Sequence, residues 1–298
     1  MLNMAEGLAR LEELAAHPVV ATVARAFADA GRDLAIVGGP VRDALLGRTT
    51  HDFDFTTDAR PDEILALIKP VSSVQWDVGR AFGTIGARVK GEQVEITTYR
   101  ADSYDGVTRK PTVEFGDTLE ADLTRRDFTV NAMALRVPAR TLVDPTGGVE
   151  DLIAGRLRTP IDPAVSFGDD PLRMLRAARF SSQLDFTVDG VTFDAIAELR
   201  ASLGIVSPER VQAELVRLLQ TDDPVRGIRV LVETGLIEEF LPEVPALRLE
   251  IDEHHHHKDV YEHSLTVLRQ AIALEKIRHP DAVPDVPLRL AALLHDIG

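Results

Sequence analysis

Cysteine is absent from this sequence, which excludes disulfide bonds and metal sites built on thiolates. No uninterrupted apolar run approaches the ~20 residues that a membrane-spanning helix needs. The N-terminus also lacks the basic region and apolar core of a targeting segment. The chain has 298 residues, 45% of them hydrophobic, which is enough for two or more domains with proper cores. We expect a cytoplasmic protein with no membrane contact.

An excess of positive charge is missing too, because the net charge is −15. This value disfavours nonspecific binding of long nucleic acids, although the distribution of charge matters more than the sum. Residues 120–180 contain nine acidic residues and nine arginines, so this part carries no acidic excess. A local basic groove is therefore compatible with binding of a short, structured RNA end.

One stretch near the N-terminus has the pattern of a strand, a glycine turn and a short helix. Residues 34–37 are apolar and end at Gly38 and Gly39, as expected for a buried strand that enters a tight turn. Pro40 suits the first helical position, and Gly47 suits the helix exit. The turn offers backbone N–H groups to an anion, with a helix N-terminus behind it.

A second strand is expected directly after this helix. In it, Asp52 and Asp54 alternate with Phe53 and Phe55, so both carboxylates are expected on one face of the strand. Two close carboxylates favour a cation, and oxygen ligands suit Mg²⁺. Arg42 adds donors that match phosphate. The combination predicts nucleotidyl transfer, whereas a glycine turn followed by an exposed acidic strand is the simpler alternative.

A third carboxylate is a candidate for the same site. Glu95 alternates with the β-branched residues Val94 and Ile96, so it is either an exposed strand residue or a ligand beside the two aspartates. Three strands are expected in this part, over residues 71–76, 81–90 and 93–99.

Two further segments frame these strands. Apolar residues at helical spacing over residues 5–30 predict one helix, which Gly31 closes. The polar segment 99–113 is expected to form a long loop of functional type.

Two stretches together resemble a known family. Residues 38–43, followed by Asp52-Phe-Asp54, resemble motif A of the class II tRNA nucleotidyltransferases, which are the CCA-adding enzymes and bacterial poly(A) polymerases. Residues 125–134 match motif B of this family almost letter for letter. The resemblance implies a polymerase-beta-like head and gives segment 99–113 a role in the switch from C to A addition. In motif B, Arg126 and Asp127 can donate to phosphate and accept from ribose hydroxyls, and Asn131 is expected to stiffen the backbone.

The stretch 169–180 opens a helix and resembles motif D. Asp170 and Arg173 lie one turn apart, which also fits a simple salt bridge. A carboxylate beside a guanidinium complements the pairing edges of cytosine and adenine and mismatches those of uracil and guanine, so the resemblance implies that this pair selects the nucleotide. Arg176 and Arg179 follow on the same helix and are expected to reach the triphosphate.

Two other stretches resemble motifs that we interpret as structural. Residues 142–152 resemble motif C, a hinge between the head and a helical neck. Residues 206–215 resemble motif E, in which Glu209, Arg210 and Glu214 are expected to brace the motif D helix.

Histidines gather near the C-terminal end. His254–His257 are internal and too few for a purification tag. His263 and His295-Asp296 resemble the start of an HD phosphohydrolase domain. Such sites need a further downstream aspartate, so we expect a truncated HD domain without a working metal site.

The sequence thus predicts an α+β protein with three parts: a nucleotidyltransferase head (1–143), a helical neck and body (144–245) and the start of an HD domain (246–298). The expected function is Mg²⁺-dependent addition of C and A to the 3′ end of tRNA from CTP and ATP, with no protein partner implied. Poly(A) polymerase, C-only or A-only addition, HD-type phosphohydrolase activity and noncatalytic RNA binding are the alternatives.

Overall fold

The computed structural model describes residues 4–48, 53–100, 116, 118–249 and 260–297. The chain divides into two compact units, the first made of Met1–Ala154 with Arg158–Ile161, and the second of Gly155–Leu157 with Asp162–Gly298. Among the described residues, no helix is long and apolar enough to cross a membrane. The α+β class is confirmed, and the division into three parts stays a prediction.

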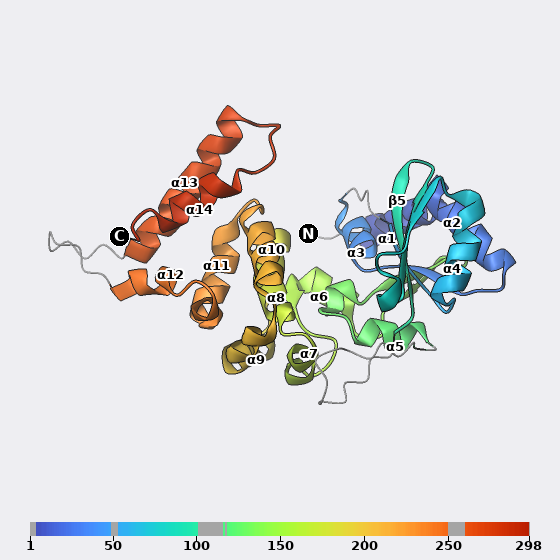
Figure 1. Cartoon of the computed structure of the whole chain (residues 1–298), viewed down its shortest axis with the longest axis horizontal. Coiled ribbons are helices and arrows are strands. Elements are labelled where there is room, and N and C mark those ends of the chain that lie inside the picture. The colour runs from blue at the N-terminus through green and yellow to red at the C-terminus, as the bar shows by residue number, and fades with distance from the viewer. Residues whose placement is uncertain (1–3, 49–52, 101–115, 117, 250–259, 298) are drawn as a thin grey trace. The chain divides into compact units, whose positions relative to one another are not determined.

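The first unit is a seven-stranded mixed sheet with helices (Figure 1). Its helices are α1 (Met4–Ala16), α2 (Pro18–Asp29), α3 (Gly39–Leu46), α4 (Pro61–Ile68), α5 (Leu119–Thr124) and α6 (Gly148–Ala154). Its strands are β1 (Leu34–Val37), β2 (Phe53–Thr57), β3 (Val74–Trp76), β4 (Thr84–Val89), β5 (Glu92–Thr98), β6 (Ala134–Arg136) and β7 (Thr141–Val143). Short 3₁₀ turns include η2 (Arg80–Phe82) and η3 (Thr129–Asn131).

The strand order of this sheet is β3-β4-β5-β2-β1-β6-β7, and among its described strands only the β2–β5 pair is parallel. Alternation along the strands gives the sheet two different faces. One face is apolar and packs on α2 and α4, with Phe55, Ile96 and Ala87 fully or almost fully buried. The other face is covered over β1 and β6 by α5, whose Leu119 and Leu123 join the core of this unit. Its continuation over β5, β4 and β3 carries exposed side chains.

The second unit is helical apart from one pair of two-residue strands, as expected for the part of the chain after the head. Its longer helices are α7 (Pro163–Asp169), α8 (Leu172–Leu184), α9 (Gly190–Leu199), α10 (Pro208–Leu219), α11 (Pro224–Glu233), α13 (Val260–Arg278) and α14 (Val286–Leu294). Shorter elements are α12 (Glu243–Ala246), η4 (Arg200–Ile205), η5 (Leu236–Glu239), η6 (Leu247–Leu249) and the strands β8 (Arg156–Leu157) and β9 (Thr187–Val188). Helix α8 packs on α10 and α11.

The expectation of one helix over residues 5–30 is wrong, because the chain forms α1 and α2 instead. His17 separates them and caps α2 with its side chain, which accepts from the Val19 N–H. Pro18 begins α2, where its missing N–H is harmless, but it could not sit inside a continuous helix without the loss of a backbone hydrogen bond. Residues 81–83, expected as strand, belong to η2 and its following glycine.

Buried Tyr99 provides a test of alkaline stability. Its hydroxyl donates to Asp33 at 2.8 Å, and burial, with the help of this carboxylate, raises the pKa of Tyr99. Because the pKa of Tyr99 is higher in the folded than in the unfolded state, its contribution to the unfolding free energy is fully present below the unfolded pKa of about 10. This contribution is lost as the pH rises further. The difference in unfolding free energy between the wild type and Tyr99→Phe should be constant from pH 8 to about 10 and shrink above it. Urea unfolding across this range checks it, and a difference that stays constant to pH 11 would contradict it.

Candidate active site

The glycine turn is formed as the sequence predicts. Gly38 has φ 75° and ψ −124°, a conformation that side chains strongly disfavour. A Cβ at this position would lie 3.2 Å from Nη1 of Arg126. The Gly38 N–H donates to the Met133 carbonyl at 3.1 Å, and this hydrogen bond anchors the turn. Helix α3 starts directly at Gly39, so its N-terminus faces the same turn.

Two of the predicted carboxylates lie on neighbouring strands of the sheet. Asp54 on β2 is the register partner of Glu95 on β5, and adjacent strands place such partners about 5 Å apart. Phe53 and Phe55 are buried on the opposite face, as expected from the alternation. A surface pocket of ≈ 190 Å³ is lined by Phe53, Asp54, Gln93 and Glu95. Asp52 lies outside the described residues, and its place in the site stays a prediction.

Motif B brings its residues to the same turn. Arg126 approaches Gly38, and its buried Nε has no hydrogen-bond partner among the described residues. A buried guanidinium nitrogen without a partner is costly unless an anion completes it. Asp127 is buried and accepts from the Asn131 amide at 3.1 Å and from the Phe128 N–H at 2.8 Å. Arg126 therefore keeps an unused donor, whereas Asp127 is held by its neighbours.

Arg42 occupies a more interior position than its expected role suggests. It is only 4% exposed, and its Nη1 donates to Asn131 at 2.5 Å. Its Nε and Nη2 donate to Asp43 at 2.9 and 3.0 Å. Asn131 therefore links Arg42 to Asp127 through its side chain, which is a larger role than stiffening of the local backbone. Direct contact of Arg42 with phosphate stays a prediction, and the geometry favours support of the turn.

Asp122 is a site residue that the sequence reasoning missed. It is 5% exposed and accepts from Nη2 of Arg126 at 3.1 Å and from the Arg100 N–H at 3.2 Å. It thereby joins the start of the predicted loop 99–113 to the arginine that faces the glycine turn, although residues 101–113 lie outside the described part. The one available signal was its spacing of four residues before Arg126, which lies just beyond the end of α5.

The motif D residues lie in the second unit. Asp170 is extended and precedes α8, so it does not lie one helical turn before Arg173 as the sequence suggests. Its Oδ1 accepts from the Leu172 N–H at 3.2 Å, which confirms an aspartate at the start of the helix. Its Oδ2 accepts from Arg210 at 3.0 Å, while Arg173 donates to the Ser166 hydroxyl at 2.8 Å. Each member of the pair is thus oriented by a different neighbour.

Farther along α8, Arg179 is engaged inside the unit. It is 8% exposed, its Nε donates to Glu214 at 2.6 Å, and its Nη1 donates to Gln183 at 2.6 Å. Arg176 lies 3.7 Å from the same carboxylate. Glu214 on α10 therefore braces α8, as expected for motif E. A role of Arg176 and Arg179 at the triphosphate stays a prediction. Because Arg179 is buried and paired with Glu214, Arg176 is the better candidate for this role.

Loss of this brace should destabilise the second unit. Glu214 is 3% exposed, so Glu214→Ala leaves the buried Arg179 without its main partner, and we expect a loss of about 3–5 kcal/mol of unfolding free energy. Glu209→Ala, on the exposed side of the same helix, is the matched control and should change stability by less than about 1 kcal/mol. Denaturant unfolding measures both. Equal effects of the two variants would show that the Arg179–Glu214 pair is unimportant.

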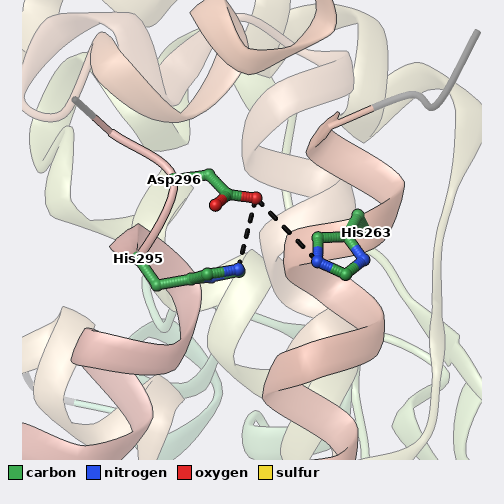
Figure 2. A group of neighbouring side chains, drawn as sticks. All are labelled: His263, His295 and Asp296. Atoms are coloured by element: carbon green, nitrogen blue, oxygen red, sulfur yellow. Dashed lines mark ion pairs between the residues drawn. The ribbon is translucent and has the colours of Figure 1, made fainter. Parts of the chain in front are cut away.

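A second cluster of possible metal ligands lies at the C-terminal end. His263 comes from α13, and His295 and Asp296 follow the end of α14 (Figure 2). Oδ2 of Asp296 lies 3.9 Å from Nε2 of His263 and 3.2 Å from Nε2 of His295. One ligand atom from each residue lies within 4.8 Å of the others. Helix packing therefore brings together the residues that the sequence related to an HD domain, and His254–His257 lie outside the described residues.

Comparison with known proteins finds a matching family model for each of the two units. Residues 34–158 match the family model described as the poly A polymerase head domain, and residues 185–247 match the one described as the probable RNA and SrmB-binding site of polymerase A. The CCA-adding enzyme of Bacillus licheniformis is 43% identical over 205 residues, which are 68% of this chain and 50% of that protein. The CCA-adding enzyme of Bacillus subtilis is 41% identical over 219 residues, 73% of this chain and 54% of that protein. The chain spans about half the length of these curated relatives.

Solved structures extend the likeness. The Bacillus stearothermophilus CCA-adding enzyme in complex with CTP is 32% identical, with a TM-score of 0.70, over 92% of this chain and 69% of that one. The Thermotoga maritima CCA-adding enzyme complexed with tRNA_CCA is 24% identical, with a TM-score of 0.71, over 96% of this chain and 65% of that one, and shows the fold alone. The family-model matches and these relatives show that the chain belongs to the class II tRNA nucleotidyltransferase family of CCA-adding enzymes and bacterial poly(A) polymerases.

Proposed function

We propose that the protein adds C and A to the 3′ end of tRNA, with CTP and ATP as substrates and pyrophosphate as the second product. The observation that carries this proposal is the register pair of Asp54 and Glu95. Two carboxylates on neighbouring strands support a metal site, for which a noncatalytic RNA-binding protein has no use. The printed names of the relatives support the same reaction.

Enzymes of this family are metal-dependent, and we propose Mg²⁺ for this chain. The oxygen-only donors that line the pocket fit this ion, which prefers carboxylates and substrate phosphates. Asp54 and the predicted ligand Asp52 would hold it, with Glu95 completing the carboxylate set. When bound, the ion supplies charge neutralisation at the triphosphate and lowers the pKa of the attacking hydroxyl.

The chain's own residues bind and orient the reactants. The N-terminus of α3, which begins at Gly39, would offer N–H groups to the triphosphate, and Arg126 adds a guanidinium with an unengaged nitrogen. Asp127, which is held by Asn131, would accept from a ribose hydroxyl. Asp170 and Arg173 would accept from and donate to the base. The RNA hydroxyl then attacks the α-phosphate in line with the leaving pyrophosphate.

The reaction is tested with labelled tRNA that lacks its 3′ end, magnesium, and CTP and ATP supplied separately and together. Sequencing of the products that end at C-C-A would support the proposal. Long A tails would indicate a poly(A) polymerase, and products that end after C or require preformed C-C would indicate C-only or A-only addition. No extension under any condition would overturn it. A cytoplasmic location is part of the proposal.

Although the sequence predicts no working metal site here, the cluster of His263, His295 and Asp296 favours a second candidate function, namely metal-dependent hydrolysis of phosphate esters. Two imidazoles and a carboxylate with ligand atoms within 4.8 Å suit a divalent transition metal. Titration calorimetry with Mn²⁺ and Ni²⁺ tests the site, with His263→Ala as the comparison. Metal binding that survives this replacement, or hydrolysis that is insensitive to it, would exclude the cluster.

A further inference from the structure

The sheet face that carries the carboxylates continues beyond them in a single row. Asp54 on β2 pairs with Glu95 on β5, Glu95 pairs with Gly86 on β4, and Gly86 pairs with Trp76 on β3. Paired residues in neighbouring strands point to the same face of a sheet. Trp76 therefore stands on the face of Asp54 and Glu95, at the exposed edge of the sheet.

Gly86 has a specific reason to lack a side chain. A Cβ at this position would lie 1.9 Å from Nε1 of Trp76 and 2.1 Å from its Cε2, so the indole lies across the glycine. The indole covers Gly86, which is buried, while Trp76 itself stays partly exposed. The ring is thereby brought one strand closer to the carboxylates. With strands about 4.8 Å apart, Gly86 is ~10 Å from Asp54 across the sheet.

A cation lies on the same face of the neighbouring strand β4. Arg88 lies two residues after Gly86 on β4 and pairs with Val74, so its side chain projects from the same face. It is exposed, and within the part of the chain that the structure describes no hydrogen bond or ion pair engages its guanidinium. An aromatic face beside a free cation is the combination with which proteins bind single-stranded nucleic acid: the ring stacks on a base, and the cation neutralises the backbone.

We propose that Trp76, with Arg88, is a stacking platform for one of the last bases of the single-stranded RNA 3′ end. The proposal rests on the proposed function, which places the terminal hydroxyl of that RNA at the carboxylates. The ~10 Å from Asp54 corresponds to about three stacked nucleotide steps of ~3.4 Å. Stacking is tolerant of sequence because every base has a π-face, so the platform would hold successive 3′ ends as C and A are added.

Because Trp76 is the one tryptophan of the chain, its emission reports the platform directly. Titration with an RNA minihelix that ends in an unpaired 3′ C-C should quench the fluorescence, and the same minihelix without the unpaired nucleotides should not. A gel-shift assay establishes that RNA is bound. Unchanged emission with bound RNA would overturn the proposal. The measurement needs no turnover, so a chain that binds RNA but never extends it would fail the proposed function while the fluorescence still decides the platform.

Kinetics provide the second test. Trp76→Leu should raise KM for the minihelix about 5- to 100-fold and leave KM for CTP unchanged, whereas Trp76→Phe, which keeps a π-face, should stay close to the wild type. Val78→Ala is the matched control on the same segment, since Val78 is 89% exposed. Circular dichroism verifies folding of each variant. A KM for RNA within twofold of the wild type in folded Trp76→Leu, or an equal increase in Trp76→Phe, would overturn the platform.

Discussion

Replacing Asp54 with asparagine is expected to lower the rate of nucleotide transfer by about 10³-fold or more and to leave the fold intact. The change removes a negative charge where the metal and the triphosphate meet, which should cost several kcal/mol of transition-state stabilisation. The side chain is only partly buried and keeps its shape, so packing of β2 should be preserved. Single-turnover extension of labelled tRNA measures the rate, and circular dichroism measures the fold. We expect the same result for Asp52→Asn.

Asp62→Asn is the matched control. Asp62 is an aspartate of the same unit with 77% of its side chain exposed, and it pairs with Arg80 at the surface. Loss of such a pair should change stability by less than about 1 kcal/mol and leave transfer unaffected. Near-normal turnover in Asp54→Asn, with an unchanged fold, would rule out the carboxylate site. Equal losses in both variants would point to a general effect of charge.

The part of the site that the sequence could predict is the part that local pattern determines. The turn at Gly38 and Gly39, the helix behind it and the alternation of Asp54 with two phenylalanines follow from glycine chemistry and the period of a strand. The sequence identifies Glu95 as a candidate ligand but cannot decide whether it belongs to the site, because its position beside Asp54 depends on the parallel pairing of β2 with β5. Strand order is a tertiary property, and an acidic residue between two apolar ones is also common at solvent-exposed strand positions without a functional role.

Other features were beyond the sequence because they depend on partners far apart in the chain. Asn131 lies 89 positions from Arg42, and the hydrogen bond between them ties Arg42 to motif B. Arg210 lies 40 positions from Asp170. Sequence periodicity predicts neither contact, because each joins residues from two different elements of the fold. The break between α1 and α2, by contrast, had a local cause in Pro18 that helical spacing alone had masked.

Exchanging Asp170 and Arg173 should change which nucleotides are added. In the double variant Asp170→Arg with Arg173→Asp, a donor replaces the acceptor and an acceptor replaces the donor. The site should therefore bind cytosine and adenine more weakly and admit uracil or guanine, whose pairing edges have the opposite polarity. Each polar group left unsatisfied against a mismatched base costs about 1–3 kcal/mol. The preference for CTP and ATP over UTP and GTP should therefore fall by about tenfold or more. Extension assays with each of the four nucleotides measure it.

The contacts of the two residues supply the control that separates base selection from a structural role. Asp170 accepts from Arg210 and Arg173 donates to Ser166, so the exchange also disturbs these neighbours. Arg210→Ala removes the partner of Asp170 but keeps the carboxylate, and it should leave nucleotide preference unchanged. If Asp170 and Arg210 form only a surface ion pair, Arg210→Ala and Asp170→Ala should have the same small effect, well under 1 kcal/mol on stability, and neither should alter preference. A changed preference in the exchanged variant, together with an unchanged one in Arg210→Ala, assigns selection to the carboxylate and the guanidinium themselves.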